Sequence, residues 1–260
     1  MRLVLLACLV VIVGGAAWLL VNDPASPGPV DRTKRRVTTV VARDSSGNGH
    51  HAIIQGPVQL GRPGLYGSSF SFDNAGSWLM VPPSPDLNPG DRDFLVSAWI
   101  YLRANLGPGE TYDVVRKGIS YTDPGEFKLE VLQHGRVRCT AKDDKDRTAR
   151  VTTSEVDVLD GRWHLIGCAR TGRRWSVLVD DTLTSRFIDL GRVENDMALS
   201  IGSKYGLEDQ PDGRVDDVKL VLGRPYYQDT GDHLTRLEAL EQRAPTARWR
   251  MDEPPARDAS

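Results

Sequence analysis

Short apolar runs with a period of two residues recur along most of the chain, and turn residues separate them. In the stretch 126–132, Phe127, Leu129 and Val131 fall on one face, and a longer strand of the same kind is centred on Trp99. Glycine, proline, asparagine and aspartate punctuate the intervals between these runs. The pattern predicts an all-β sandwich over residues 38–243.

One later segment breaks this period of two. Leu234, Leu237 and Leu240 recur at helical spacing within residues 232–241, and Asp232 can cap the first turn. We therefore expect one short surface helix near the C-terminal end of the domain.

The N-terminal end of the chain is apolar throughout. Residues 3–21 carry no charged side chain and are numerous enough to span a bilayer. We predict that residues 1–22 form an uncleaved signal anchor that reaches the membrane, and a cleaved signal peptide is the alternative. Residues 23–37 contain several prolines and a basic cluster, so we expect them to form a linker.

Charge and cysteine content narrow the classes of function. The chain has 33 basic and 35 acidic residues and a formal net charge of −2, which argues against a nucleic-acid binder. Cys139 and Cys168 are the only cysteines outside the apolar N-terminus, and both fall in predicted strands. In an exported protein we expect them to pair, whereas two separate buried thiols would suit a cytoplasmic domain. We favour the disulfide and an extracytoplasmic domain, either membrane-anchored or secreted.

The segment 42–51 (ARDSSGNGHH) partly fits a calcium-binding loop. Asp44 and Asn48 lie on alternate positions of a tight, glycine-rich loop, so their oxygens can converge on one point. Gln55 stands where an EF-hand requires a carboxylate, which excludes that motif. We expect Asp44 and Asn48 either to tie the turn or to help hold a cation.

Asp216 is the third candidate ligand for a cation. The period of two in residues 213–222 places it on the face of Val218, Leu220 and Leu222. A carboxylate turned toward an apolar face needs a partner. Hydrogen bonding is the simplest solution, and a calcium ion shared with Asp44 is the sharper prediction.

Sequence patterns typical of catalysis are absent. The chain contains no strand-borne Glu-x-Asp-x-x-Glu, no Gly-x-Ser-x-Gly elbow and no His-Glu-x-x-His. We therefore predict that the protein is not an enzyme. Sugar sites use exposed aromatic rings, and Tyr112, Tyr121 and Tyr205 in predicted loops are the candidate ligand contacts, whereas Trp99 and Trp163 are expected in the core.

Several of these short motifs stand in a familiar order. They are the segments 44–49 (DSSGNG), 70–73 (FSFD), 78–82 (WLMVP), 94–100 (FLVSAWI), 160–164 (DGRWH) and 213–218 (GRVDDV). The ordered set resembles a bacterial LamG-like domain (laminin G type 3) of the concanavalin A-like lectin/glucanase superfamily. The resemblance covers about residues 40–243.

The resemblance implies an antiparallel jelly-roll of two sheets, a structural calcium ion near Asp216, and a paired Cys139 and Cys168. It also implies a binding module whose leading partner is a glycan. A protein-interaction or structural cell-envelope domain without a sugar site is the second hypothesis, and a divergent glycoside hydrolase is the third.

The two ends of the domain depart from the family pattern. The family opens with a Trp-x-x-Asp-Glu strand shortly before the DSSGNG segment, and residues 37–41 lack it. Residues 247–253 (ARWRMDE) carry a similar pattern instead. Our hypothesis is that the tail, residues 244–260, folds back as an edge strand; a truncated second repeat is the alternative.

Overall fold

The structure is a computed structural model, and it describes most of the chain beyond the N-terminal segment. The described residues are 39–73, 75–103, 106–119, 121, 124–153, 156–225, 231–252 and 256–258. The chain divides into two units, residues 1–37 and 38–260, and every described residue belongs to the second. The predicted signal segment and linker therefore lie outside the described residues. Within the described part, no helix combines the length and apolarity needed to cross a membrane.

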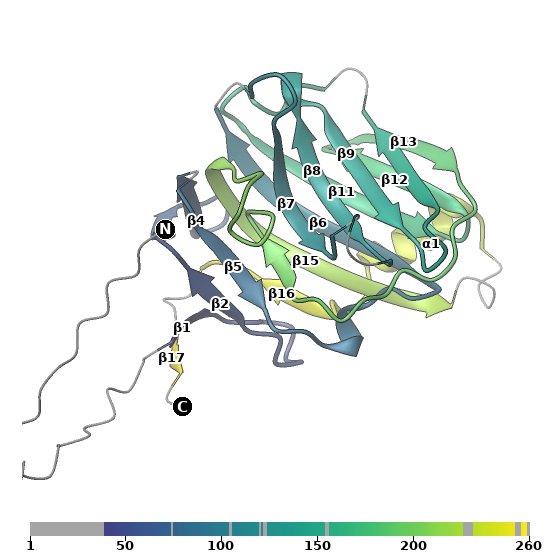
Figure 1. Cartoon of the computed structure of the whole chain (residues 1–260), viewed down its shortest axis with the longest axis horizontal. Helices are drawn as coiled ribbons and strands as arrows, with labels where there is room; N and C mark the ends of the chain where they lie inside the picture. The colour runs from purple at the N-terminus through teal and green to yellow at the C-terminus, as the bar shows by residue number, and fades with distance from the viewer. Residues whose placement is uncertain are drawn as a thin grey trace, which may run out of the picture. The chain divides into compact units, whose positions relative to one another are not determined.

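Two antiparallel sheets packed face to face form the second unit (Figure 1). The nine-stranded sheet has the order β10 (Thr148–Thr152), β9 (Val137–Lys142), β8 (Phe127–Leu132), β7 (Thr111–Lys117), β14 (Leu199–Ile201), β5 (Trp78–Val81), β2 (Ala52–Gln55), β1 (Thr39–Ala42) and β17 (Ala256–Asp258). The eight-stranded sheet has the order β13 (Thr182–Phe187), β12 (Arg174–Val179), β11 (Trp163–Thr171), β6 (Arg92–Leu102), β15 (Asp212–Pro225), β4 (Ser68–Asp73) and β3 (Gln59–Pro63), with β16 (Ala247–Trp249) paired to β15. Two single 3-10 turns, Pro85–Leu87 and Gln133–Gly135, lie in connections. The all-β sandwich predicted from the alternating pattern is confirmed.

The core lies between the two sheets. Phe94 of β6 packs against Phe127 of β8 and Trp175 of β12, with ring centroids 5.5 and 5.7 Å apart, respectively. All three side chains are buried. Because alternate residues of a strand point to opposite sides, each strand gives one set of side chains to this core and another to an outer face.

A disulfide joins the two sheets directly. Cys139 of β9 and Cys168 of β11 are bonded, and both side chains are buried in the core. The predicted pairing is confirmed, and the bond connects strands from opposite layers.

The predicted short helix is also present. α1 (His233–Glu241) begins after Asp232, whose carboxylate accepts a hydrogen bond from the Thr235 N–H group. Leu237 and Leu240 pack on the outer face of the eight-stranded sheet in a cluster separate from the main core. The helix therefore covers one end of that face.

A β-bulge in β15 changes the predicted orientation of Asp216. Asp216 pairs with Trp99 and Lys219 pairs with Ser97, so two residues of β15 oppose one residue of β6. Asp217, inside the bulge, has a positive φ of 44°. Val218 lies in the core, but Asp216 lies on the opposite, outer side of the sheet, so its predicted face was wrong.

The tail returns to the sandwich at two places. β16 pairs with residues 218–220 of β15, and β17 pairs with residues 39–41 of β1. Trp249 of β16 is fully buried in the core, and its ring N–H group donates to the His50 carbonyl oxygen at 2.8 Å. The segment 244–252 is thereby part of the folded domain.

Candidate functional site

The polar loop at the start of the domain is held by its own hydrogen bonds. The Asp44 carboxylate accepts bonds from the N–H group and the hydroxyl of Ser46, at 2.9 and 2.8 Å. It also accepts the N–H groups of His50 at 2.9 Å and Arg248 at 3.0 Å. Burial raises the pKa of Asp44, but the hydrogen bonds from Arg248, Ser46 and His50 outweigh it and keep the pKa below its ordinary value. Asp44 therefore ties the loop to the tail.

Asn48 has the same structural role. Its side-chain amide donates to the carbonyl oxygen of Thr246 at 2.9 Å, on the segment that leads into β16. Its side chain thus secures the tail to the loop rather than facing a neighbouring carboxylate.

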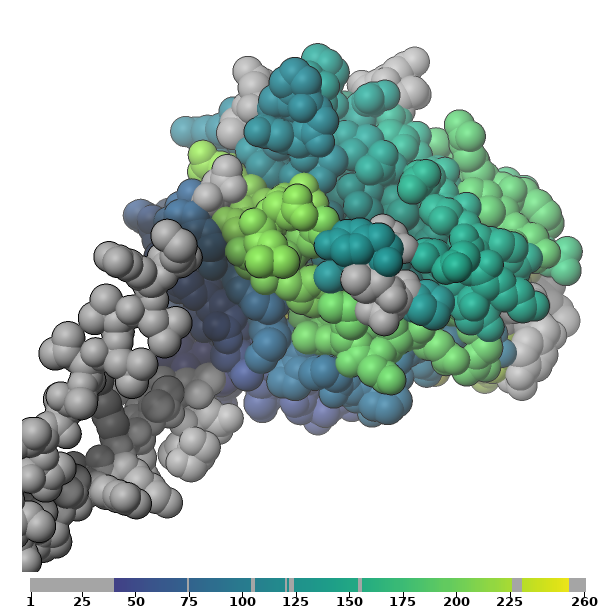
Figure 2. Space-filling view, viewed as in Figure 1, coloured from purple at the N-terminus to yellow at the C-terminus, as the bar shows by residue number. Residues whose placement is uncertain are grey.

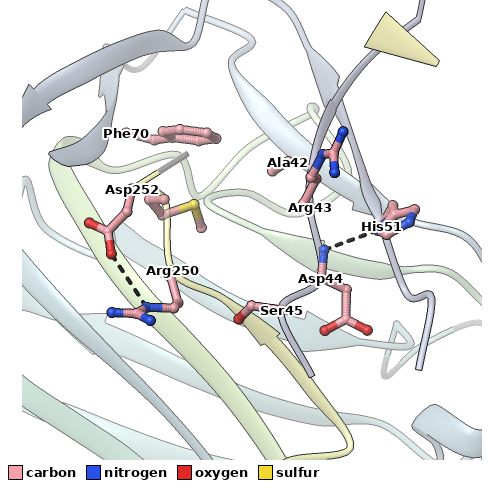
Figure 3. A pocket seen from close by; sticks show the side chains of 9 residues that line it. Ala42, Arg43, Asp44, Ser45, His51, Phe70, Arg250 and Asp252 are labelled. Atoms are coloured by element: carbon pink, nitrogen blue, oxygen red, sulfur yellow. Dashed lines mark hydrogen bonds and ion pairs between the residues drawn. The ribbon is translucent and has the colours of Figure 1, made fainter. Parts of the chain in front are cut away.

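A pocket of about 340 Å³ lies beside this loop (Figure 3). Figure 3 shows the Asp44 carboxylate at its edge, pointing away from Arg43 and Phe70. The other acid of the pocket, Asp252, lies 3.3 Å from the Arg250 guanidinium and accepts a bond from the Ser68 N–H group. Both carboxylates are already engaged, so this pocket offers a poor set of ligands for calcium.

Asp216 has partners different from those of Asp44 and Asn48. Its Oδ2 atom accepts the N–H groups of Leu65 at 3.0 Å and Tyr66 at 3.4 Å, and burial raises its pKa to about 6. Its Oδ1 atom is buried and has no hydrogen-bond partner among the described residues. That oxygen is suited to be one ligand of a calcium ion. The side chains of Asp44 and Asn48 are not suited to be further ligands of the same ion, because they are hydrogen-bonded to the tail. Over the described ranges, no three histidine, cysteine or acidic side chains are grouped to hold a metal ion.

The three candidate tyrosines lie in different environments. Tyr112 lies in β7 and is 5% exposed, so its predicted loop position was wrong because the strand already begins at Thr111. The Tyr205 hydroxyl accepts the Gly118 N–H group at 2.8 Å, and burial raises its pKa to about 12. Tyr121 is 70% exposed. Only Tyr121 presents most of its ring to solvent.

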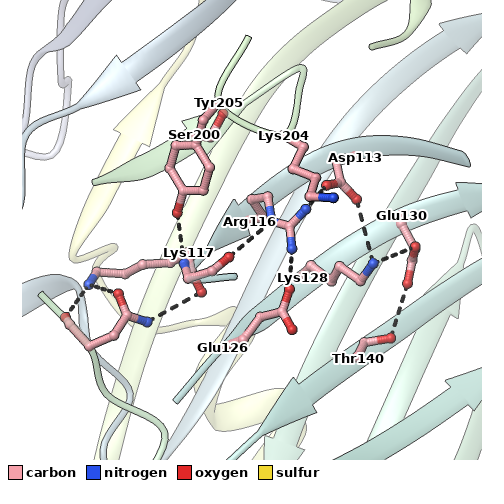
Figure 4. Close-up of polar contacts among 12 residues, drawn as sticks. Asp113, Arg116, Lys117, Glu126, Lys128, Glu130, Thr140, Ser200, Lys204 and Tyr205 are labelled. Atoms are coloured by element: carbon pink, nitrogen blue, oxygen red, sulfur yellow. Dashed lines mark hydrogen bonds and ion pairs between the residues drawn. The ribbon is translucent and has the colours of Figure 1, made fainter. Parts of the chain in front are cut away.

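A network of charged side chains occupies the outer face of the nine-stranded sheet (Figure 4). Arg116 of β7 contacts both Asp113 and Glu126, and Lys128 of β8 lies 2.9 Å from Glu130. Except for Lys128, these side chains are almost fully buried. Burial raises the pKa of Asp113 to about 7, although Arg116 and Lys128 act to lower it.

The chain itself covers this network. The Asp113 N–H group donates to the Asp209 carbonyl oxygen at 2.8 Å, and the ring of Tyr205 forms a T-shaped contact with Trp78 of β5. Figure 2 shows the yellow-green segment around residues 202–211 on the surface of this face. The region over β5 and β7 is therefore closed to a ligand.

A row of three side chains crosses the outer face of the eight-stranded sheet. Trp163 of β11, Tyr101 of β6 and Arg214 of β15 are direct neighbours in register, so they share one face. The two rings have centroids 5.6 Å apart. The Arg214 guanidinium lies 4.0 Å from the Tyr101 centroid and 5.4 Å from that of Trp163. These distances are typical of cation–π contacts.

A second aromatic pair adjoins this row. Trp99 lies two residues before Tyr101 on β6, and Tyr66 contacts it edge-on with centroids 6.3 Å apart. Trp99 and Trp163 are half-buried on the outer face, so their expected core position was wrong. The alternation in residues 94–102 indicates this outward orientation, because Trp99 and Tyr101 are out of phase with the core residue Ile100.

A groove of about 430 Å³ lies beside the row. Tyr101, Arg62, Arg103, Arg214 and Asp212 are among the residues that line it. Half-exposed rings next to planar hydrogen-bonding groups are what a saccharide site requires, because sugars present apolar faces and hydroxyl edges. This surface, which we call the aromatic row, is the candidate functional site.

The sequence matches one family model. Residues 73–222 match Laminin_G_3, which is described as the concanavalin A-like lectin/glucanases superfamily. No curated protein matches the sequence.

Several solved structures with a similar fold are toxin binding domains. The binding domain of Paraclostridial Mosquitocidal Protein 1 is 17% identical, with a TM-score of 0.53 over 72% of this chain and 47% of that one. The binding domain of Botulinum Neurotoxin DC in complex with SialylT is 12% identical, with a TM-score of 0.52 over 71% and 47%. The Botulinum Neurotoxin serotype G binding domain is 14% identical, with a TM-score of 0.55 over 78% and 50%. The chain spans about half of each of these, and the likeness shows the fold.

Proposed function

Because the chain belongs to the concanavalin A-like lectin/glucanase superfamily, we propose that it is a binding module that holds glycans on its aromatic row. The proposal is for binding without catalysis. The chain lacks the acidic strand motif of a glycoside hydrolase, and the structural neighbours described above are binding domains.

The observation that carries the proposal is the row of Trp163, Tyr101 and Arg214 beside an open groove. The strands of a rigid sheet hold all three side chains, so the surface is in place before a ligand arrives. The corresponding face of the other sheet is closed over β5 and β7 by residues 202–211. One neighbour was solved as a complex with SialylT, which supports a saccharide as the kind of ligand.

Replacing Trp163 by alanine is expected to weaken glycan binding by up to about tenfold, because it removes a stacking surface worth about 0.5–1.5 kcal/mol. An array of immobilised glycans identifies the ligand, and titration calorimetry then compares the variant with the wild type. Phe187→Ala is the matched control, since Phe187 is 65% exposed on β13 of the same sheet but outside the row.

Unchanged affinity in the Trp163→Ala variant would contradict the location of the site. An array without any bound glycan at high protein density would instead favour a protein-interaction or structural domain of the cell envelope.

We also propose that Asp216 contributes to a structural calcium site. Calcium is therefore expected to raise the melting temperature of the domain above its value in EGTA, because a ligand that binds only the folded state stabilises it. Asp216→Asn is expected to abolish this difference. Asp44→Asn is the control, and it is expected to lower the melting temperature in both solutions while the difference stays. Calcium-independent melting of the wild type would refute the site.

The proposed place of action is outside the cytoplasm, with the domain either anchored by residues 1–22 or secreted. The buried disulfide supports this placement, since such bonds persist mainly in oxidising compartments.

A further inference from the structure

The geometry points to a saccharide that carries carboxylate or sulfate groups as the ligand of the aromatic row. This inference rests on the proposed function and adds to it the chemical class of the ligand. It is carried by three arginines that line one groove and have no acidic partner among the residues that the structure describes.

Arg214 is fixed in place but keeps most of its hydrogen-bonding capacity. Its guanidinium lies 4.0 Å from the Tyr101 ring centroid and 5.4 Å from that of Trp163, and one terminal nitrogen donates to the Pro63 carbonyl oxygen at 2.7 Å. A guanidinium has five N–H donors in a rigid fork. Stacking on rings lowers the entropy that the side chain loses when the remaining donors bind an anion.

Arg103 and Arg62 bring two further cations to the same groove. The Arg103 guanidinium lies 4.9 Å from the Tyr101 centroid and donates to the Tyr101 hydroxyl. Arg62 donates to the side chain of Gln59 at 3.0 Å. Both arginines are exposed, and both line the groove together with Arg214.

The groove carries an excess of positive charge. In the described part of the chain, these three arginines donate to the Gln59 side chain, the Tyr101 hydroxyl and the Pro63 carbonyl oxygen rather than to a carboxylate. Asp212 is the one acidic residue among the described residues that line the groove. Three cations and one anion leave a local charge of about +2, although the whole chain has a formal net charge of −2. A neutral sugar would form no ion pair with these arginines, whereas a uronate or a sulfate would pair with them.

The other side of Trp99 has the opposite character. Beyond Trp99 along the same face, a second hollow is lined by Asp180, Asp181, Asp217 and Glu241, with Lys219 as the one basic residue. Asp217 is paired with Arg248 and Asp180 is hydrogen-bonded to His164, so the repulsion of an anionic group at that end comes mainly from Asp181 and Glu241. The charged substituent of the ligand is therefore placed at the Arg103 end, and neutral or amino-substituted units are placed toward α1.

The test uses pairs of oligosaccharides that differ only in charge. The probes are an oligogalacturonate and its methyl ester, a sulfated oligosaccharide and its desulfated form, and a sialylated oligosaccharide and its asialo form. Titration calorimetry at low and moderate salt measures each affinity. In at least one pair we expect the anionic member to bind at least about tenfold more tightly, which is the effect of about one charge-assisted hydrogen bond. Added salt is expected to reduce the difference.

Two variants locate the effect. Arg103→Gln and Arg214→Gln are each expected to weaken binding of the anionic member at least about tenfold more than binding of the neutral member, so that the preference within the pair is lost. Arg162→Gln is the matched control, since Arg162 is exposed, pairs with Asp160 and lies outside the groove lining. Melting curves establish that each variant is folded, and Arg103, which is exposed, keeps the test valid if Arg214→Gln unfolds.

The outcomes separate the two proposals. Equal affinity within every pair would overturn the anionic class and leave glycan binding intact. Failure to bind any member would overturn both. Equal competition by a poly-glutamate peptide would show that the arginines recognise charge alone, and would overturn the assignment to a saccharide.

Discussion

Replacing Cys139 and Cys168 together by alanine is expected to lower the free energy of unfolding by about 3–4 kcal/mol. The two residues are 29 positions apart, and closing a loop of this size restricts the unfolded chain by about that amount in the chain-entropy model. For a domain of this size, the melting temperature should fall by about 10 °C. In the folded state the same bond joins β9 to β11, on opposite layers of the sandwich.

Thermal unfolding with and without a reductant checks this prediction. The wild type should lose stability when reduced, and the double variant should melt at the same temperature under both conditions. Equal melting temperatures of the oxidised wild type and the double variant would show that the bond contributes nothing to stability.

Trp249→Ala is expected to destabilise the domain by about 3–5 kcal/mol, as other large aromatic truncations in cores do. Trp249 is completely buried, and its ring N–H group is bonded to the His50 carbonyl oxygen. The substitution therefore removes packing between the sheets and leaves a polar group unpaired. Urea unfolding, followed by far-ultraviolet circular dichroism of the backbone rather than by tryptophan fluorescence, measures the loss of stability.

Two further variants are compared with Trp249→Ala. Arg250→Ala changes the next residue, which is exposed, and should have little effect. Removing residues 245–260 should prevent stable folding, because β16 and its side chains are lost together. A truncated domain with the stability of the wild type would disprove the role of the tail in the fold.

The strands and the helix could be predicted because their patterns are local. The period of two places Phe127, Leu129 and Val131 on one face of β8, and the helical spacing of Leu237 and Leu240 places both on the sheet. The cysteine pair could be predicted from composition and the expected compartment.

The faces of β15 and β6 were harder to predict. The run from Val215 to Leu222 looks continuous in the sequence, and nothing local reveals that Asp217 is the extra residue of a bulge. One such residue moves Asp216 to the outer face. In β6 both faces carry large apolar side chains, so aromatic content alone could not show that Trp99 and Tyr101 face outward.

The aromatic row could not be predicted because it depends on pairing between distant strands. Trp163, Tyr101 and Arg214 come from three separate segments, and only the register of β11, β6 and β15 brings them together. The bonding of Asp44 and Asn48 to the tail depends on tertiary contacts in the same way, since the tail uses the hydrogen-bonding groups that a metal would need.

The last strand has a consequence for solubility. An exposed strand edge presents unpaired N–H and C=O groups, to which a strand of another molecule can add. β17 occupies the edge of β1 over residues 39–41 and is itself only three residues long. At the opposite edge of the same sheet, β10 is short and carries the exposed, charged Arg150. Both edges of the nine-stranded sheet are therefore poor templates for intermolecular β-pairing, which favours a domain that resists aggregation at high local concentration.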